Sequence, residues 1–378
     1  MLRVLNIMSR FNVGGTSQFL FHLSQELESK GYENLLLVGD CAEMESEDNR
    51  LSEIRHSKLN GLGPNDSLLE SLRAVFRIRK VIKEFNPDVI NTHTSKAGFL
   101  GRLANLTLKT RPTLTHTFHG HVFHGYFNSF VERVVKYIER LLMHLTDYVF
   151  VVGDRVLRDL QQLKIVTNKN VTVVWPYVPE FSLGDRNELR KSLGIAEDDL
   201  VVGWLGRKVP IKRLDRIVEL SRRLPSCIFL IAGDGNSYLP ESSQFFTPHK
   251  DKNLIEIGVS APESIWAISD ICLSVSDNEG IPISPIECSL AGKPIVATNV
   301  GSSDEVVVNG ITGFLCAPNV DSIFSSLVLL LENAKLRQEF GRNAHTFAKA
   351  KFDSERCLQT YIEGYTSASA LKNGVRET

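Results

Sequence analysis

The chain has little of what marks several common classes of protein. Its six cysteines are scattered among 378 residues with no CxxC pair, which argues against a disulfide framework and a cysteine-based zinc site. The 43 Lys and Arg nearly balance the 44 Asp and Glu, so the charge does not indicate a nucleic-acid-binding protein. Arginines interrupt the short apolar run at the start of the chain, and no apolar run reaches the roughly 18–20 residues of a membrane-spanning helix. We therefore expect a cytoplasmic protein that binds no nucleic acid, and peripheral contact with the inner face of a membrane stays open.

Two glycine-rich nucleotide fingerprints are also missing. The stretch AGDGNSY at 232–238 is not G-x-G-x-x-G, because residue 238 is tyrosine. The P-loop pattern G-x4-G-K-[ST] does not occur either. A nicotinamide- or flavin-dependent dehydrogenase is therefore disfavoured.

Short apolar runs alternate with helix-period stretches along the whole chain. In the first half the runs RVLNIM, NLLLVG, DVINTH, TLTHTF, DYVFVVG and VTVVW have the composition of buried strands. In the second half LVVGWLG, CIFLIAGDG, NLIEIG, ICLSVS, KPIVATN and GFLCAP continue the pattern. Such alternation is typical of parallel sheets covered by helices. We predict an α/β protein with two Rossmann-like, doubly wound domains that face a central cleft.

A break in this pattern marks the predicted domain boundary. The stretch WPYVPEFSLG at 175–184 has two prolines and no clean periodicity. We place an N-terminal domain at 1–178, a linker at 179–184 and a C-terminal domain at 185–352. Residues 353–378 are expected to form a C-terminal helix that packs back on the first domain.

Two helices of the first half have apolar stripes. In 67–85, Ser67 and Glu70 have capping-box spacing, and one face is expected to carry Leu69, Leu72, Phe76 and Phe85. In 129–147 the stripe consists of Phe130, Val134, Ile138, Leu141 and Leu145. A core position is expected for this second stripe. The alternative is a face that touches a membrane, which Arg133, Lys136 and Arg140 would suit.

Glu279 and Glu287 bracket the stretch EGIPISPIE between two predicted strands. Ser284 is a candidate N-cap and Pro285 a candidate first helical residue, so Ser284 and Glu287 can be interpreted as a capping box. The N–H groups of Gly280, Ile281 and Ile283 lie between the two acids and are able to face a phosphate or a sugar.

The C-terminal half resembles retaining nucleotide-sugar glycosyltransferases of GT-B family four. The resemblance is carried by the E-x7-E motif at 279–287, by GKPIVATNVGSSDEVV and NGITGFL after it, and by GRKVPIKR at 206–213. Family members often have Gly-Leu-Pro and EAMA where this chain has Ile-Pro-Ile and ECSL, and a glycine where it has Arg213. None of these departures removes a functional group.

The resemblance implies a donor site. Arg207 and Lys212 would neutralise the leaving diphosphate, with Arg213 either adding charge or facing water. Glu279 would lie by the hydroxyls of the donor sugar and Glu287 would bind the ribose hydroxyls. The turn with Gly14 and Gly15 would approach the donor, and the base would lie near Gly258 and Val259. The residues expected on the donor side are therefore Gly14, Gly15, Arg207, Lys212, Gly258, Val259, Glu279, Gly280, Ile281, Ile283 and Glu287.

The segment LTHTFHGHVFHGYF holds four histidines. Metal binding is not favoured, because no cysteine is nearby and only His119 and His121 would share a strand face. The resemblance places a histidine that precedes glycine close to the donor sugar, which fits His119 best and His121 second. The segment NTHTSKAGFLGRLAN resembles a subgroup that builds bacterial surface polysaccharides, so His93, Ser95, Lys96 and His121 are expected on the acceptor side.

The predicted function is transfer of a sugar from a nucleoside-diphosphate sugar to a hydroxyl of a saccharide or lipid-linked saccharide, with retention. No D-x-D motif occurs, so no metal and no other cofactor is expected. His119, Arg207, Lys212 and Glu279 are the predicted catalytic residues. Another GT-B enzyme, such as an inverting transferase or a nucleotide-sugar 2-epimerase, and a non-catalytic nucleotide-sugar-binding subunit remain as alternatives.

Overall fold

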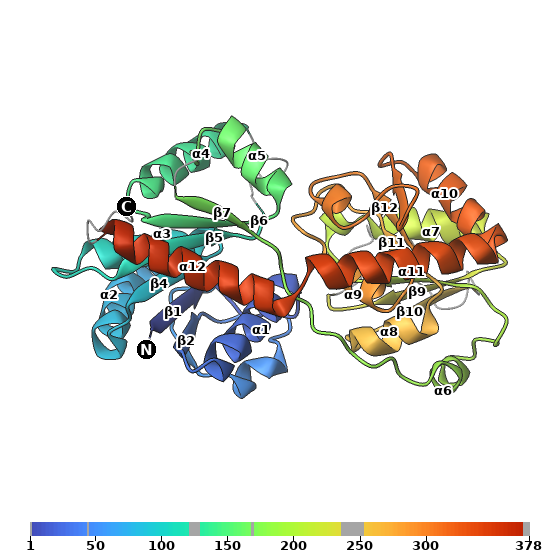
Figure 1. The fold of residues 1–378 in the computed structure, drawn as a ribbon, viewed down its shortest axis with the longest axis horizontal. Helices are drawn as coiled ribbons and strands as arrows, with labels where there is room; N and C mark the ends of the chain where they lie inside the picture. Colours follow the sequence, from blue (N-terminus) through green and yellow to red (C-terminus); the bar gives the residue numbers. More distant parts are fainter. Residues whose placement is uncertain (1, 44, 121–128, 168–169, 236–252, 373–378) are drawn as a thin grey trace. The chain divides into compact units, whose positions relative to one another are not determined.

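The computed structural model describes residues 2–43, 45–120, 129–167, 170–235 and 253–372. The chain divides into two compact units (Figure 1). The first unit consists of Met1–Tyr177 and Ser354–Thr378, and the second consists of Val178–Asp353. Among the described helices, none combines the length and the apolar composition needed to cross a bilayer.

The first unit is built on a seven-stranded sheet in which every neighbouring pair is parallel. Its strand order is β3-β2-β1-β4-β5-β6-β7. The strands are β1 (Arg3–Met8), β2 (Glu33–Val38), β3 (His56–Lys58), β4 (Val89–His93), β5 (Thr113–Phe118), β6 (Tyr148–Val152) and β7 (Val171–Val174). The helices are α1 (Gly15–Ser29), α2 (Leu68–Phe85), α3 (Ser95–Leu106), α4 (Ser129–Met143), α5 (Asp154–Gln162) and α12 (Ser354–Lys372), with the 3-10 helix η1 (Asn49–Glu53).

The second unit has a six-stranded parallel sheet with the order β10-β9-β8-β11-β12-β13. The strands are β8 (Val201–Leu205), β9 (Ile228–Ala232), β10 (Leu254–Ile257), β11 (Ile271–Ser274), β12 (Ile295–Thr298) and β13 (Gly313–Cys316). The helices are α6 (Arg186–Ser192), α7 (Leu214–Arg223), α8 (Pro262–Ile268), α9 (Ile283–Leu290), α10 (Val320–Glu332) and α11 (Ala334–Lys351), with the 3-10 helices η2 (Pro210–Lys212) and η3 (Ser303–Glu305). All twelve strands expected from the apolar runs are present, and the predicted α/β class with two Rossmann-like units is confirmed.

The C-terminal helix α12 packs on the sheet of the first unit. Tyr361 and Tyr365 are fully buried, and their hydroxyls lie within hydrogen-bond distance of Thr117 (3.3 Å) and Asn91 (3.1 Å). Gly364 permits the close approach, because a Cβ there would lie 2.4 Å from the ring of Phe150. A chain segment more than 200 residues away in sequence therefore completes the core of this unit.

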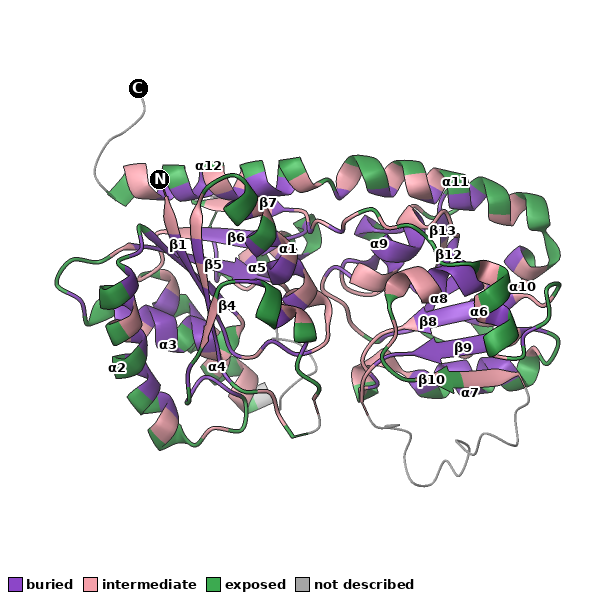
Figure 2. Cartoon of the chain, turned by 90° about the horizontal axis from the view of Figure 1, so that it is seen from below, coloured by how far each residue is buried: buried purple, intermediate pink, exposed green. Residues whose placement is uncertain are grey.

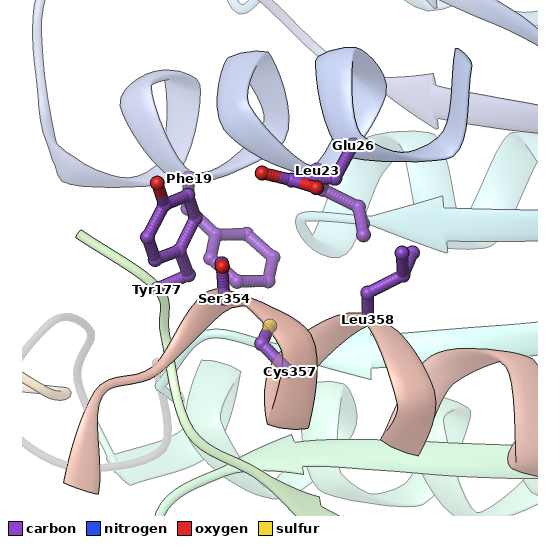
Figure 3. Close-up of a pocket in the computed structure, with 7 residues that line it drawn as sticks. All are labelled: Phe19, Leu23, Glu26, Tyr177, Ser354, Cys357 and Leu358. Atoms are coloured by element: carbon purple, nitrogen blue, oxygen red, sulfur yellow. The ribbon is translucent and has the colours of Figure 1, made fainter. Parts of the chain in front are cut away.

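A small pocket lies between α1 and the start of α12 (Figure 3). It is lined by Phe19, Leu23, Glu26, Tyr177, Ser354, Cys357 and Leu358. Its volume of about 10 Å³ admits about one water molecule. The pocket is far too small for a sugar nucleotide.

The N-terminus of α2 forms as predicted, but its buried face does not. The Ser67 hydroxyl accepts a hydrogen bond from the Glu70 N–H at 3.2 Å, which is the N-cap half of a capping box, and the Glu70 carboxylate accepts from Arg73 and Arg77. The side chains that pack inward are Ser71, Ala74, Val75, Ile78, Ile82 and Phe85. Leu69, Leu72 and Phe76 are exposed, so the predicted apolar face was wrong in three of its four residues. Apart from Phe85 at the end of the helix, small and β-branched residues form the packed stripe, and the other large apolar side chains lie outside it.

The predicted core stripe of α4 is also wrong. Phe130, Val134, Ile138 and Leu141 are exposed, and Leu145 is half-buried. The inward side of this helix carries Val135, Leu142 and Met143 together with Glu139, whose carboxylate forms a buried ion pair of 2.8 Å with Arg102 of α3. An unpaired charge inside a protein is costly, so this pair fixes which side of α4 faces the protein.

Candidate functional site

The site in the second unit lies where the order of its strands reverses. The chain proceeds outward from β8 to β9 and β10, and then returns to β11 on the other side of β8. In open α/β sheets ligands bind at such a switch point, outside the carboxyl ends of the strands. Arg207 and Lys212 follow β8, and Glu279 follows β11. Sheet topology therefore places these three predicted residues at one edge, independently of any motif.

Backbone hydrogen bonds hold the loops at this edge together. The Asp277 N–H donates to the Ile211 carbonyl at 2.9 Å, which links the loop after β11 to the loop after β8. The Lys208 N–H donates to the Asp234 carbonyl at 2.8 Å, which adds the loop after β9. Arg207, the second residue after β8, is half-buried in this arrangement.

Lys212 and Glu279 are in direct contact. The Lys212 ammonium lies 2.6 Å from Oε1 of Glu279, and the Ser276 hydroxyl donates to the same oxygen at 2.5 Å. The Glu279 carbonyl accepts from the Ser302 N–H at 3.3 Å. Gly301 has φ 51°, and a Cβ there would lie only 1.8 Å from the Glu279 carbonyl oxygen. The glycine of the VATNVGSS segment is therefore required for the position of the first glutamate.

Arg213 is held in a different way from Lys212. Its guanidinium donates to Asp215 at 2.7 and 2.9 Å and to Asp277 at 2.9 Å. These hydrogen bonds raise the pKa of Arg213 above its usual range, and the interaction with Asp215 contributes most. Its backbone is left-handed with φ 53°, a conformation that glycine adopts with less strain. Two carboxylates thus neutralise Arg213. Lys212 contacts one carboxylate, so a ligand phosphate would have to compete with one carboxylate for its ammonium.

The helix that carries Glu287 begins earlier than predicted. Pro282 is its N-cap, and no side chain caps it, so the capping box of Ser284 with Glu287 is wrong. The helix is followed by Gly292, as expected, with φ 70°. Glu287 is the fifth helical residue and its side chain is buried, with 2% exposed.

The other donor-side residues predicted in the second unit lie in loops at the same edge or at the start of α9. Gly280 and Ile281 connect Glu279 to α9, and Ile283 is the first residue of that helix. The carbonyl of Gly258 accepts from the Gly233 N–H at 3.1 Å, and the side chain of Val259 is exposed. These positions are compatible with the predicted donor contacts but do not test them.

In the first unit the strand order reverses between β1 and β4. Gly14 and Gly15 follow β1 at the start of α1, and Ser95 and Lys96 follow β4 at the start of α3. His119 comes directly after β5, the next strand. Gly14 has an extended backbone with φ 163°, which any residue adopts, so backbone conformation does not explain that glycine. His121 lies outside the described residues.

Thr94 and Ser9 follow β4 and β1 at the carboxyl edge of the first unit's sheet. Neither residue was predicted from the sequence. Thr94 has φ 64° and ψ 156°, a strained conformation for a β-branched residue. Its hydroxyl lies 2.6 Å from that of Ser9, and the Ser9 oxygen also accepts the Ala97 N–H at 3.3 Å. Lys96 donates to the carbonyl of Gly63, and burial lowers the pKa of its ammonium. Only the unusual backbone of Thr94 marks this site, and no sequence pattern signals it.

A hydrogen-bonded chain of buried side chains leads to His119. The Asn6 amide donates to Asn34 at 2.8 Å, so the Asn6 oxygen accepts from Nε2 of His93 at 3.0 Å. Nδ1 of His93 then accepts from Nε2 of His119 at 2.9 Å. This chain leaves Nδ1 of His119 as a hydrogen-bond acceptor. His93 is completely buried, so it would influence a ligand only through His119.

His93 and His119 are both uncharged at neutral pH. Burial lowers the pKa of His119 to about 3 and that of His93 well below its usual range. The ring of Phe19 packs edge-on against His119 with a centroid distance of 5.2 Å. His119 therefore offers a neutral imidazole, not a cation. His116 is a structural residue, buried and bonded through Nδ1 to the Thr92 hydroxyl at 2.8 Å.

The buried histidines predict a pH-dependent stability. Burial keeps the pKa of His93 and His116 well below the usual value, so unfolding lets each ring take up a proton once the pH falls below about 6.5. Above about pH 6.5 the free energy of unfolding is not reduced by this proton uptake. Below that pH it falls by about 1.4 kcal/mol per pH unit for each fully buried histidine. We expect the free energy of unfolding, measured with urea between pH 7.5 and 5.5, to decrease as the pH falls.

His116→Gln should reduce this slope by about the contribution of one histidine, whatever it does to stability at pH 7.5. The exposed His144 supplies the matched control, and His144→Gln should leave the slope unchanged. Equal slopes in the native protein and His116→Gln would contradict a neutral, buried His116.

Comparison with known proteins matches each unit to a family model. Residues 13–179 match the model of glycosyltransferase family 4, and residues 185–347 match that of glycosyl transferases group 1. A UDP-Gal:α-D-GlcNAc-diphosphoundecaprenol α-1,3-galactosyltransferase of Escherichia coli is 26% identical over 72% of this chain and 73% of its own length. The capsular polysaccharide biosynthesis glycosyltransferase CapM of Staphylococcus aureus is 21% identical over 87% of this chain and 88% of its own.

Solved structures show the same fold. Sucrose-phosphate synthase from Thermosynechococcus elongatus has a TM-score of 0.83 at 17% identity, covering 98% of this chain and 100% of that one. Anabaena HepE in complex with UDP and glucose has a TM-score of 0.80 at 19% identity, covering 97% and 100%. Among the described residues no group of three His, Cys, Asp or Glu side chains is arranged to hold a metal ion. The protein is a glycosyltransferase of the GT-B fold, in which a family 4 domain is followed by a group 1 domain.

Proposed function

We propose that the protein transfers a glycosyl unit from a nucleoside-diphosphate sugar to a hydroxyl acceptor, with retention at the anomeric carbon. The observation that carries this proposal is the Lys212–Glu279 pair at the switch point of the second unit. It places one cation and one carboxylate side by side, with Arg207 on the same loop as the lysine. A diphosphate needs cations, and a sugar needs hydrogen-bond acceptors, so this edge offers both parts of a donor site.

Donor binding changes the partner of Lys212. The diphosphate competes with Glu279 for the ammonium, and the carboxylate is then available to sugar hydroxyls. Arg207 adds a second cation, and Glu287 accepts the ribose hydroxyls. The N–H groups of Gly280, Ile281 and Ile283 and the backbone at Gly258 and Val259 complete the donor site of the second unit.

The difficult step is departure of the diphosphate from the anomeric carbon. As that C–O bond breaks, negative charge grows on the phosphate oxygens, and Arg207 and Lys212 stabilise it. The acceptor oxygen forms its bond on the same face of the sugar, and its proton passes to the leaving phosphate. No protein nucleophile and no metal are needed in this mechanism. His119, held by His93, offers Nδ1 as an acceptor for a sugar hydroxyl.

Relatives suggest the substrates. The E. coli galactosyltransferase uses, by its name, a UDP-sugar and a diphosphoundecaprenol-linked acceptor, and HepE was crystallised with UDP and glucose. We extend this to the present chain as a UDP-sugar donor and a lipid-linked saccharide acceptor, consistent with surface-polysaccharide synthesis. Ser95 and Lys96, at the start of α3, are proposed for the acceptor side, and His121 remains a prediction from the sequence. The proposed location is cytoplasmic and peripheral to the membrane.

The test is a panel of UDP-, GDP- and ADP-sugars incubated with the purified protein, with and without lipid-linked acceptor and with and without EDTA. We expect one nucleoside diphosphate to be released only when acceptor is present, at a rate that EDTA does not change. The anomeric proton coupling of the product, measured by NMR, should match that of the donor. A rearranged sugar nucleotide formed without acceptor would indicate an epimerase, an inverted coupling an inverting transferase, and binding without turnover a non-catalytic subunit.

A further inference from the structure

Three neighbouring helices cover one face of the sheet in the first unit. Figure 2 shows α2, α3 and α4 on the opposite side of this sheet from α12. Helices α2 and α3 pack against each other, and the buried Arg102–Glu139 pair joins α3 to α4. Their outer sides therefore form one surface, which we call the α2–α4 surface.

This surface carries large apolar side chains on the outside of its helices. On α4, Phe130 is 68% exposed, and Val134, Tyr137, Ile138 and Leu141 follow it at helical spacing. On α2, Phe76 is 66% exposed, and Leu68, Leu69 and Leu72 are also exposed. Phe99 and Leu106 extend the surface across α3. Exposed apolar groups gathered in this way mark an interaction site.

The same helices carry a strong excess of positive charge. The segments 68–85, 95–106 and 129–143 contain ten Lys and Arg and four Asp and Glu, an excess of six positive charges. The whole chain has a net charge of −1, so the rest of the molecule is acidic. Arg73, Arg77, Lys80 and Lys83 lie among or just beyond the exposed apolar residues of α2, and Arg133 and Arg140 lie on α4.

We propose that the α2–α4 surface docks on the headgroup region of an anionic lipid bilayer. Apolar side chains that enter the interface and cations that attract anionic headgroups are the two requirements for such binding, and here they share one surface. A second copy of the chain is disfavoured as the occupant, because like surfaces would bring two sets of excess positive charge together. The inference rests on the proposed function only in that a lipid-linked acceptor would be found at such a bilayer.

The experiment is sedimentation of the full-length protein with vesicles of phosphatidylcholine alone or with 30% phosphatidylglycerol. We expect binding to the anionic vesicles, at least tenfold weaker binding to neutral ones, and a marked loss at 0.5 M salt, where headgroup charges are screened. The variant Phe76→Ser/Phe130→Ser should lower binding to anionic vesicles at least tenfold. The control Ile311→Ser/Leu329→Ser replaces two exposed apolar residues of the second unit and should bind like the native protein.

Glycosyl transfer to a water-soluble acceptor should be unchanged in Phe76→Ser/Phe130→Ser, which separates this proposal from the proposed function. Three outcomes would overturn docking on anionic lipid. They are no vesicle binding, equal binding of the native protein and the α2–α4 variant, and a homodimer in sedimentation velocity that only this variant abolishes.

Discussion

Replacing Lys212 with alanine is expected to reduce kcat for glycosyl transfer by about 10²–10³-fold, the usual cost of losing a group that stabilises charge in the transition state. The ammonium contacts Glu279 before donor binds, and the proposed mechanism transfers it to the leaving diphosphate. Its attraction is greatest when the anomeric C–O bond is broken, so kcat should fall more than the donor KM rises. Initial rates of nucleoside diphosphate release at varied donor concentration measure both quantities. A loss below about threefold would show that Lys212 is not the leaving-group cation.

The adjacent residue provides the matched control. Arg213→Gly also removes one positive charge, but that charge is already neutralised by Asp215 and Asp277. Glycine adopts the left-handed backbone of this position easily, which offsets part of the lost ion pairing. We expect its kcat to stay within about threefold of the native value, since paired surface charges contribute little. Similar large losses in both variants would mean that net charge of the loop matters and not the position of Lys212.

Much of this site is predictable because topology fixes it. Alternating strands and helices place the ends of β8 and β11 together, so any residues that follow those strands meet at one edge. This topology brings together Arg207, Lys212 and Glu279, which the family resemblance singles out. The direct contact between Lys212 and Glu279 is not, because it joins residues 67 positions apart whose side chains meet only in three dimensions.

The predictions that failed did so because tertiary partners override local patterns. The predicted apolar stripe of α4 lies outward because the opposite side packs inward, with Val135, Leu142 and Met143 on the core and Glu139 paired with Arg102. The capping box at Ser284 does not form because α9 begins at Ile283, after Pro282. His93 has the sequence of a site residue, yet its burial allows it only to hold His119. Sequence patterns thus predict which loops share one edge of a sheet more readily than which side of a helix faces inward.

The buried carboxylate of Glu287 leads to the second large prediction. If it accepts both ribose hydroxyls, Glu287→Gln replaces charged acceptors by one neutral oxygen and one amide donor at nearly constant volume. Hydrogen bonds to a charged group contribute about 1.5–3 kcal/mol, so affinity for the nucleotide should fall by about 10–100-fold. Calorimetric titration with UDP, with GDP and ADP alongside, measures the change. Glu332→Gln, an exposed substitution at the end of α10, is the control and should bind normally.

A ligand without the two hydroxyls distinguishes a ribose contact from a general weakening of the site. Native protein and Glu287→Gln should bind 2′,3′-dideoxyuridine diphosphate with nearly equal affinity, because the interaction is already absent in both complexes. The effects of Glu287→Gln and of removing the two ribose hydroxyls would then be strongly non-additive, which is the mark of a direct contact. If each change instead weakens binding independently, Glu287 supports the fold of α9 and the nucleotide is held by other groups.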